Sequence, residues 1–417
     1  MRALVIYQHA PTPGAPGIYR HRTLLAELVR RGWDIDLVSS PINYMDGTVP
    51  ERYAGERYVR EEIDGIVHHW VRASDDVHRS FRRRARNYVT FAANATLRGA
   101  RLPRPDVVWA SSPPLSVASA GRMVARRHRR PFVLEVRDLW PESAAAVGLL
   151  REESRLYRLI DRFARAYASA AACTIVPTPG LVELVRGHGA RDVQLVTGAI
   201  EDHPPDPATR SRIRAAHGIP EDACVFAYVG AHGVVNGLDV LLDAAQMVAD
   251  AAHTSSDAPV HVLMAGAGSA SAAIDERLAA KPIPRVHRLG PVPKSEARAL
   301  LAAADVGLHL LRPDPVFESA LPTKVLEYLG CHLPFITTVP GLPSQVAEAT
   351  GGDLAEDAQA LAAAMGRWAS MPADERQARG AGAFAWGDEA YGLSASVDAL
   401  ESALTRAAAR GTNSKLR

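Results

Sequence analysis

One pattern occurs twice in this chain of 417 residues and limits the folds open to it: a short apolar strand, a glycine-rich loop and an amphipathic helix. In the first half the strand is Arg2–Tyr7, the loop contains Pro11–Gly17, and the helix is Tyr19–Arg31, followed by a second strand over Trp33–Ser39. Short apolar runs predict buried strands, and apolar residues at helical spacing predict an amphipathic helix. The order strand, helix, strand is that of a β-α-β unit, in which ligands bind at the carboxyl ends of the strands.

The second half begins the same pattern again. The strand Cys224–Val229 leads into the loop Gly230–Gly237 (GAHGVVNG), the helix Leu238–Ala249 and the strand His261–Ala265. Between the halves, Glu201–Pro207 has three prolines in seven residues, as expected of a linker. A chain of this length is too long for one ordinary core. We therefore expect an α/β protein made of two doubly wound, Rossmann-like domains that face a central cleft.

We expect these domains to cover residues 1–200 and 201–385. Residues 386–417 contain a predicted long Ala/Leu helix, Trp386–Arg410, which is expected to pack back toward the first domain. Pro41–Asp64 is predicted to be loop. The remaining predicted strands are Gly65–Val71, Asp106–Ala110, Pro131–Val136, Cys173–Pro177, Val193–Val196, Arg285–Leu289, Asp305–Leu311 and Phe335–Val339.

The segment after the strand Asp305–Leu311 suits an anion. Pro322 and Thr323 open a predicted helix that carries Lys324 in its first turn. A helix amino terminus offers free N–H groups and the positive end of the helix dipole, and the lysine adds a full charge. Glu327 lies one turn further on, where a carboxylate can accept hydrogen bonds from the two vicinal hydroxyls of a ribose. The alternative is a capped surface helix with an exposed lysine and glutamate.

The first half offers polar groups at the ends of its predicted strands. Ser112 follows one strand, and another ends in Arg137-Asp138-Leu139-Trp140-Pro141-Glu142-Ser143. Charged residues at the carboxyl end of a parallel strand are either functional or a salt-bridged strand end. A nucleoside diphosphate bound mainly by the second half would meet its partner near Gly17, Ser112 and Arg137.

Composition excludes several classes of protein. A hydrophobic content of 47%, with 23% charged residues and a formal charge of +2, describes a globular protein that is no nucleic-acid binder as a whole. Two basic clusters, His78–Arg86 and Arg122–Arg130, are either solvated helix faces or a contact with an anionic or membrane surface. The Gly266-Ala267-Gly268 turn lacks the full dinucleotide fingerprint, because the sixth position is Ser271, and this disfavours an NAD-dependent oxidoreductase.

The cysteines and the lengths of the apolar runs indicate the cellular compartment. Three widely spaced residues, Cys173, Cys224 and Cys331, form neither a metal motif nor a disulfide framework, as expected in a reducing compartment. The start of the chain, MRALVIYQHA, is predicted to be a strand and not a signal peptide, and no apolar run reaches about 18 residues. We therefore expect a cytoplasmic protein, with peripheral contact at the inner membrane surface as an option. The heavy use of alanine and arginine suggests a bacterial source.

Several segments together carry a resemblance to a known family. They include DVVWASSPPLSVASAG (Asp106–Gly121), PFVLEVRDLWPESAAAVG (Pro131–Gly148), YVGAHGVVNGLDVLLDAA (Tyr228–Ala245) and LPTKVLEYLGCHLPFI (Leu321–Ile336). With these motifs the chain resembles glycosyltransferase family 4, which has the GT-B fold. Within that family it is similar to the branch of bacterial polysaccharide and amino-sugar (fucosamine-transferase-like) transferases.

The resemblance implies a retaining transfer from a nucleotide-diphosphate sugar, with no metal ion and no cofactor. Residues 1–200 would then be the acceptor side and residues 201–385 the donor side. The implied donor-binding residues are Gly230, His232, Gly233, Glu318, Ser319, Pro322, Thr323, Lys324 and Glu327. The implied acceptor-binding residues are His9, Gly17, Arg20 and Ser112, and the implied catalytic residues are Arg137, Asp138 and Glu142.

The chain departs from the family pattern at the donor site. The family's first acid, eight residues before Glu327, is replaced by Ser319, and Glu318 is out of step by one. Ala231 and Asn236 stand where relatives have an arginine and a lysine. His232 either replaces part of the missing charge or is polar surface.

Two questions stay open at this level. The acceptor is a lipid-diphosphate-linked sugar at a membrane or a soluble small molecule, such as a secondary-metabolite scaffold. The alternatives to a transferase are a nucleotide-sugar epimerase on the same fold and a catalytically silent GT-B protein that binds nucleotide.

Overall fold

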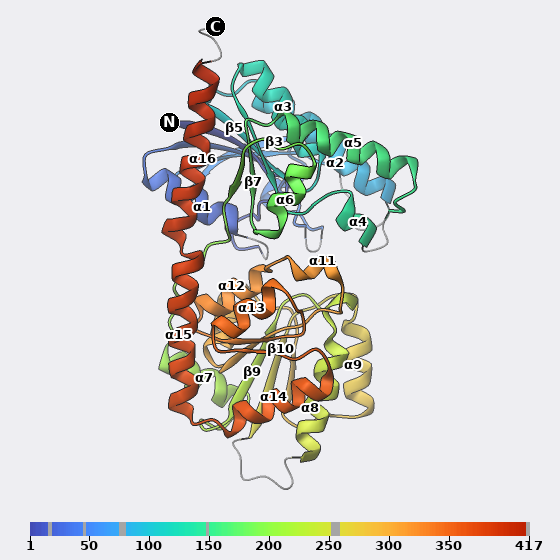
Figure 1. Ribbon diagram of the computed structural model, residues 1–417, viewed down its shortest axis with the longest axis vertical. Helices are drawn as coiled ribbons and strands as arrows, with labels where there is room; N and C mark the ends of the chain where they lie inside the picture. Colours follow the sequence, from blue (N-terminus) through green and yellow to red (C-terminus); the bar gives the residue numbers. More distant parts are fainter. Residues whose placement is uncertain (16–18, 45–46, 75–80, 147–149, 252–258, 414–417) are drawn as a thin grey trace. The chain divides into compact units, whose positions relative to one another are not determined.

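The computed structural model describes residues 1–15, 19–44, 47–74, 81–146, 150–251 and 259–413 (Figure 1). The chain divides into two compact units. The first unit combines Met1–Ala199 with Leu393–Arg417, and the second unit is Ile200–Gly392. Each unit is a sheet covered by helices on both faces.

The first unit contains an eight-stranded sheet in the order β3-β4-β2-β1-β5-β6-β7-β8. All neighbouring strands pair in parallel except β3 and β4, which are antiparallel. The strands are β1 (Arg2–Ile6), β2 (Asp34–Ser39), β3 (Tyr58–Ile63), β4 (Ile66–Val71), β5 (Val107–Ser112), β6 (Phe132–Val136), β7 (Cys173–Val176) and β8 (Val193–Leu195).

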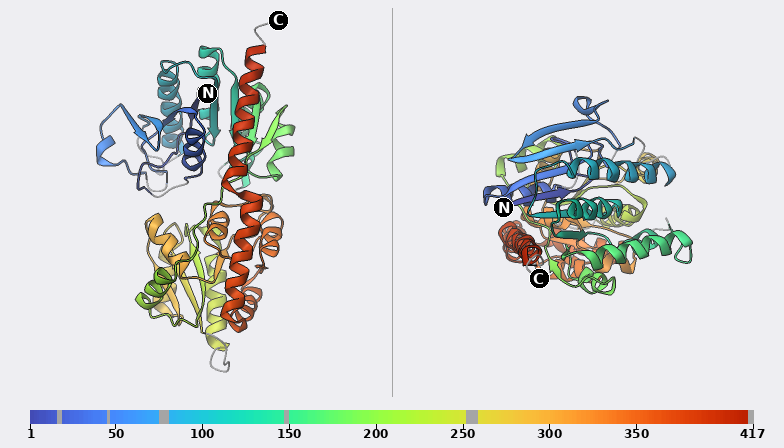
Figure 2. Two further views of the ribbon diagram at one scale, coloured as in Figure 1. Left: turned by 90° about the vertical axis from the view of Figure 1, so that its left-hand side faces the viewer. Right: turned by 90° about the horizontal axis from the view of Figure 1, so that it is seen from above.

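Helices cover both faces of this sheet. They are α1 (Arg20–Arg30), α2 (Phe81–Gly99), α3 (Ser116–His128), α4 (Glu142–Ala146), α5 (Arg155–Ala170), α6 (Gly180–Gly187) and α16 (Leu393–Asn413), with a 3₁₀ turn, η1, over Glu51–Tyr53. One core joins α1 and α16 to the sheet through residues such as Leu24 and Leu400, and the other joins α2 and α3 through Phe91 and Val124. The right view of Figure 2 shows α2, α3 and α5 side by side.

The second unit contains a six-stranded, fully parallel sheet in the order β11-β10-β9-β12-β13-β14. The strands are β9 (Cys224–Val229), β10 (Val260–Ala265), β11 (Val286–Leu289), β12 (Val306–His309), β13 (Phe335–Thr337) and β14 (Asp353–Leu354). The helices are α7 (Pro207–Ala216), α8 (Leu238–Ala251), α9 (Ser271–Ala280), α10 (Lys294–Ala302), α11 (Pro315–Glu318), α12 (Thr323–Gly330), α13 (Leu342–Ala349), α14 (Ala358–Ser370) and α15 (Ala373–Tyr391), with a 3₁₀ turn, η2, over Val234–Asn236.

Strand order places a ligand site in each unit. In the first unit the chain moves outward from β1 to β2 and β4, and then outward the other way from β5 to β6 and β7. In the second unit the same reversal separates β9 from β12. Open α/β sheets bind ligands beyond the carboxyl ends of the strands at such a switch point. The residues after β1 and β5, and those after β9 and β12, are therefore where function is expected.

Two predicted segments were wrong. Pro41–Asp64 is predicted to be loop, yet it contains β3. Three consecutive charged residues in this strand, Arg60, Glu61 and Glu62, obscure the apolar pattern that predicts a strand. Such charges are tolerated because β3 is an edge strand. The predicted single helix Trp386–Arg410 is two helices, because the chain leaves helical geometry at Gly392, where φ is −59° and ψ is 147°. There the backbone N–H of Ile200 donates to the carbonyl of Tyr391 at 2.9 Å.

Among the described residues, every helix is too short or too polar to cross a lipid bilayer.

Candidate active site

The Lys324 side chain lies at the switch point of the second unit. It comes from the first turn of α12, as the sequence predicts, and its Nζ donates a hydrogen bond of 3.0 Å to the hydroxyl of Tyr228 at the end of β9. The same nitrogen lies 4.1 Å from the centroid of the Tyr228 ring, a cation–π distance. Burial lowers the pKa of Lys324 to about 8, and nearby Glu327 opposes this shift. The ammonium is thus poorly hydrated and ready to pair with an anion.

The glycine loop after β9 is held close to the turn after β10. A Cβ atom on Gly266 would come 1.8 Å from the carbonyl oxygen of Gly230, and one on Gly268 would come 2.5 Å from that of His232. The N–H of His232 donates to Ala267 at 3.0 Å, and the N–H of Ala270 donates to His232 at 2.8 Å. The Gly266-Ala267-Gly268 turn therefore supports the loop that carries Gly230 and Gly233, which explains its glycines without a dinucleotide.

His232 is wholly buried, so the alternative of polar surface is wrong. Burial, with help from the charge of Arg288, lowers its pKa to about 4. The ring is therefore neutral near pH 7 and does not replace the positive charges absent at Ala231 and Asn236. The His232 ring lies beneath the glycine loop, next to Gly266.

Asn236 also points inward. Its Oδ1 accepts a hydrogen bond of 3.0 Å from the N–H of Gly233, which closes the η2 turn, and the residue is buried. From outside, the Arg312 guanidinium donates to the carbonyl of Val234 at 3.0 Å and pairs with Asp239 of α8. Where relatives are expected to have a lysine, this chain therefore has a residue that fixes the shape of the loop.

The remaining predicted donor residues lie around α12. Pro322 precedes the helix in an extended conformation, and the side chains of Thr323 and Glu327 are exposed. Partial loss of hydration raises the pKa of Glu327, against Lys294 and Arg298 of α10, which lower it. Glu318 ends α11 and is exposed. Its carbonyl lies 2.5 Å from where a Cβ on Gly341 would be, so α11 packs against the turn after β13. Ser319 follows it and is half-buried.

Arg137 lies at the switch point of the first unit. Its guanidinium is 4.9 Å from the centroid of the Tyr7 ring and 3.4 Å from both the Tyr7 hydroxyl and the carbonyl oxygen of Pro113. Its backbone N–H donates to the carbonyl of Ser112 at 3.0 Å. Sequence reasoning placed Ser112 and Arg137 together, and the structure does bring them together at the ends of β5 and β6.

His9 lies beyond β1 in the same region. Its ring is 4.6 Å from that of Tyr44 and 6.3 Å from that of Tyr88, centroid to centroid. Burial, together with the charge of Arg137, lowers the pKa of His9 to about 3, so the imidazole is neutral and one of its nitrogens can accept a hydrogen bond. Asp138 is exposed, and Gly17 lies outside the described residues.

The Arg20 side chain forms a buried ion pair. Its Nη1 lies 2.5 Å from Oε1 of Glu135, which is fully buried in β6, and its Nη2 donates to the carbonyl of Val196 at 2.7 Å. His21 Nε2 lies 2.7 Å from the other oxygen of Glu135, and its ring stacks on that of Tyr7 at 4.0 Å. The carboxylate therefore fixes a column of rings on which the Arg137 guanidinium rests.

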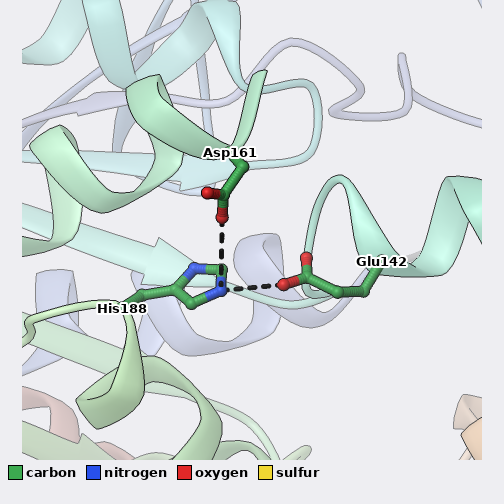
Figure 3. Close-up of side chains that lie close together, drawn as sticks. All are labelled: Glu142, Asp161 and His188. Atoms are coloured by element: carbon green, nitrogen blue, oxygen red, sulfur yellow. Dashed lines mark hydrogen bonds and ion pairs between the residues drawn. The ribbon is translucent and has the colours of Figure 1, made fainter. Parts of the chain in front are cut away.

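Glu142, which the family resemblance implies to be catalytic, pairs with a histidine (Figure 3). Its Oε1 lies 2.8 Å from Nε2 of His188, and Asp161 of α5 lies 4.0 Å from the same nitrogen. Ligand atoms of the three residues lie within 4.8 Å of one another, close enough for a metal ion. However, both oxygens of Asp161 accept a hydrogen bond from Nε of Arg165, each at 2.9 Å. That arginine supplies the positive charge that a metal would bring, so the cluster is satisfied as an ion-pair network.

Sequence reasoning missed Tyr7, His21, Glu135 and Tyr228. The first three sit in an apolar strand or on a buried helix face and look like core. Glu135 did leave a signal, because it is the one charged residue within the five residues of β6. Tyr228 is the last aromatic residue before the glycine loop, but nothing in the sequence shows that Lys324 reaches it.

Two family models match the chain, one in each half. The family model described as glycosyl transferase 4-like domain matches residues 17–199, and the one described as glycosyl transferases group 1 matches residues 223–370. No curated protein sequence matches the chain significantly.

Solved structures resemble it over nearly its whole length. HepE from Anabaena in complex with UDP-glucose has a TM-score of 0.68 at 15% identity, covering 97% of this chain and 99% of that one. Sucrose-phosphate synthase from Thermosynechococcus elongatus has a TM-score of 0.68 at 16% identity, covering 96% and 97%. Trehalose 6-phosphate synthase from Burkholderia multivorans has a TM-score of 0.66 at 16% identity, covering 99% and 98%.

These findings define the class of protein. The fold, with two Rossmann-like units, is GT-B. The two family models lie one on each unit, and both describe glycosyltransferases. The chain belongs to the glycosyltransferases with the GT-B fold, and it is a glycosyltransferase.

Proposed function

We propose that this enzyme transfers a sugar from a nucleoside-diphosphate sugar to an acceptor with retention of configuration, and without a metal ion or another cofactor. The observation that carries the proposal is the poorly hydrated ammonium of Lys324, which the α12 amino terminus and Tyr228 hold beside the glycine loop. A nearby carboxylate, Glu327, suits the ribose hydroxyls. The solved HepE structures contain UDP-glucose or UDP, which supports the same class of donor.

Fixed cations explain how such a site lowers the barrier. During transfer the bond from the sugar C1 to the diphosphate oxygen breaks, and negative charge grows on the leaving diphosphate. Lys324 and the N–H groups that open α12 are in place before the reaction, so they stabilise that charge without reorganising. The acceptor hydroxyl bonds to C1 and gives up its proton. In this proposal the second unit binds the donor and the first unit binds the acceptor.

The first unit supplies the proposed acceptor groups. Arg137, held by Tyr7, would bind a phosphate or polar group of the acceptor, and Asp138 would orient the acceptor hydroxyl or take its proton. His9, neutral and next to Arg137, would accept a hydrogen bond from the acceptor. Arg20 would act through Glu135 and not by contact, and Glu142 would hold the α4–α6 region through His188.

The acceptor remains a choice of two classes: a lipid-linked saccharide, as in the amino-sugar branch, or a soluble small molecule. A cytoplasmic setting in a bacterium remains the expectation, and the three buried, unpaired cysteines fit a reducing compartment.

A second candidate function is a silent GT-B protein that binds nucleotide without transfer. It is favoured by the inward-facing Asn236 and by Ala231, which leave the loop after β9 without the two expected cations. An epimerase on the same fold would convert the donor with no acceptor present.

Calorimetric titration with UDP, GDP, dTDP, ADP and CMP tests the proposal. We expect one diphosphate to bind at micromolar concentration, and Glu327→Ala to weaken that binding. The matched control is Glu348→Ala, an exposed glutamate on α13. Unchanged binding in Glu327→Ala would refute the site. Binding without transfer to any acceptor and without donor hydrolysis would favour the silent protein, and donor turnover without acceptor would favour the epimerase.

A further inference from the structure

Exposed apolar side chains gather on one part of the first unit. Twelve large apolar residues are exposed in the described part of the chain, and six of them lie on α2, α3 and α5. They are Val89 (65% exposed), Leu97 (54%), Met123 (48%), Leu156 (38%), Leu159 (50%) and Phe163 (47%). A concentration of this kind on one face marks an interaction surface, whereas single exposed apolar residues are ordinary.

The three helices form one continuous layer. His128 of α3 bonds to the carbonyl of Gly99 at the end of α2 at 2.9 Å, and Ser119 of α3 bonds to the Tyr167 hydroxyl of α5 at 2.5 Å. Figure 2, in its right view, shows them side by side, with α3 in the middle. The sheet lies beneath them, so their outer sides form a single face, here called the α2–α3–α5 face.

This face is strongly basic as well as apolar. The three helices carry twelve arginines and one acidic residue, Asp161, which already pairs with Arg165. Neither α2 nor α3 contains an acidic residue. The whole chain has a formal charge of only +2, so positive charge is concentrated here.

Helix α5 shows how the two properties combine. Leu156, Leu159 and Phe163 follow one another at intervals of three and four residues, which puts them in one row along the helix. Arg155, Arg158 and Arg162 have the same spacing and form an exposed row beside it. Ala164 and Ala168 are buried on the other side. A helix that exposes leucine and phenylalanine next to a row of arginines has the composition of helices that lie in a membrane interface.

We propose that the α2–α3–α5 face docks on an anionic lipid membrane. Apolar side chains would enter the boundary between headgroups and acyl chains while the arginines pair with the lipid phosphates, and neither term alone gives stable binding. The charge complementarity selects a phospholipid surface: a second copy of this face would bring arginines against arginines. The inference is independent of the proposed donor chemistry.

A single introduced cysteine reports on this contact. The native Cys173, Cys224 and Cys331 are all buried, and burial raises their pKa values to about 12, so an accessible cysteine can be labelled selectively. Leu159→Cys, carrying an environment-sensitive dye, is compared with Met247→Cys, which replaces a side chain of similar exposure (46%) on α8. Each is mixed with vesicles of phosphatidylglycerol or of phosphatidylcholine.

We expect a blue shift of the dye at position 159 with phosphatidylglycerol vesicles, none with phosphatidylcholine, and none at position 247. Replacing Arg155, Arg158 and Arg162 by glutamine should weaken vesicle binding roughly 100-fold, at about fivefold for each arginine, and added salt should weaken it further. Glutamine at Arg57, Arg60 and Arg191, exposed arginines elsewhere in the first unit, is the matched control.

Three results would overturn the proposal. They are a dye that responds to no vesicle, equal loss of binding in the control triple variant, and a blue shift without vesicles that grows with protein concentration. The last result would show that a second copy covers the face.

Discussion

The ammonium of Lys324 donates a 3.0 Å hydrogen bond to the Tyr228 hydroxyl and lies 4.1 Å from the centre of its ring. The tyrosine hydroxyl in turn donates to the carbonyl of Ala231 at 2.6 Å. Through these two hydrogen bonds, the ammonium of Lys324 on α12 is held in a fixed position beside the glycine loop after β9. The charge is held by a neutral partner, so it stays available to an anionic ligand.

Lys324→Ala should therefore remove most of the transfer activity. Loss of one preorganised donor to a developing anion typically lowers the rate about 100- to 1000-fold, and binding of the nucleoside diphosphate should weaken as well. Steady-state kinetics and calorimetry measure the two effects. Tyr228→Phe is the control, because it keeps the ring and removes only the hydroxyl, and we expect less than about a tenfold effect. Equal damage in both variants would show that the lysine only supports the loop.

The lowered pKa of Lys324, about 8, predicts a pH dependence of donor binding. Below pH 8 the lysine is an ammonium, and above it the free protein loses this charge. Diphosphate affinity should then fall by about tenfold per pH unit above pH 8, until the pKa of the lysine in the complex is reached. His232 and His309 are neutral throughout this range, with pKa values lowered by burial to about 4 and about 3. A Lys324→Met variant should show no break at pH 8, and an unchanged break would assign it to another group.

Local pattern was sufficient to predict the elements that carry the site. β12 and α12 have apolar residues at the spacing of a strand and of a helix, and a proline opens α12. The anion-binding amino terminus of α12 follows from that local sequence. The same reasoning located the end of β6, where Arg137 projects beside Ser112.

Contacts between distant segments explain what the sequence did not predict. β3 is a strand because β4 pairs with it, although three of its six residues are charged. His232 is buried because the turn at Gly266–Gly268 closes over it, which depends on a segment more than thirty residues away. Asn236 looks like a lost lysine in the sequence, and only the structure shows that it bonds to Gly233.

Gly266→Ala tests the fit between the two loops of the second unit. Gly266 has a φ of +140°, and an added Cβ would meet the Gly230 carbonyl at 1.8 Å, so the glycine loop must move. We expect a loss of about 2 kcal/mol or more in unfolding free energy, together with weaker nucleotide binding. Gly290→Ala is the matched control, since a Cβ there meets nothing within 4 Å. Urea unfolding and calorimetry measure both, and normal nucleotide binding in Gly266→Ala would contradict the assigned support.

Asp138→Asn separates binding from transfer. Asp138 is exposed at the end of β6, in the unit proposed to bind the acceptor, so nucleotide affinity should stay within about twofold. If its carboxylate takes the acceptor proton, the turnover rate should fall about 100-fold or more, because general-base catalysis typically contributes 10²–10⁴-fold. Calorimetry of the nucleotide and kinetics with saturating donor give the two values. A variant with full turnover would leave Asp138 as an ordinary surface residue.

The buried carboxylate of Glu135 makes the sharpest prediction about stability. Burial alone would raise its pKa, but the charge of Arg20 and the contact with His21 hold the pKa of Glu135 well below its usual range. Glu135→Gln leaves the nearly buried Arg20 without a counter-charge, and removal of one partner of such a pair typically costs about 3–5 kcal/mol. Urea unfolding at pH 7.5 should show this loss. Asp64→Asn, which breaks the more exposed pair with Arg22, should cost less than about 1 kcal/mol.

The same group predicts how the difference changes with pH. Because the pKa of Glu135 is lower in the folded state, its stabilisation is complete above the pKa of an unfolded glutamate, about 4.3, and is lost as the pH falls below it. The pKa of His21 is also lowered, to about 4, so wild-type stability should already begin to decline below about pH 6.5. Glu135 raises the pKa of His21, so its removal leaves that pKa at least as low, and the variant shares this decline. Unfolding curves at pH 7.5, 5.5 and 3 should therefore show an equal gap between wild type and Glu135→Gln at the first two pH values and a narrower gap at pH 3. A gap that stays constant down to pH 3 would mean that Glu135 stabilises the unit by packing and not by its charge.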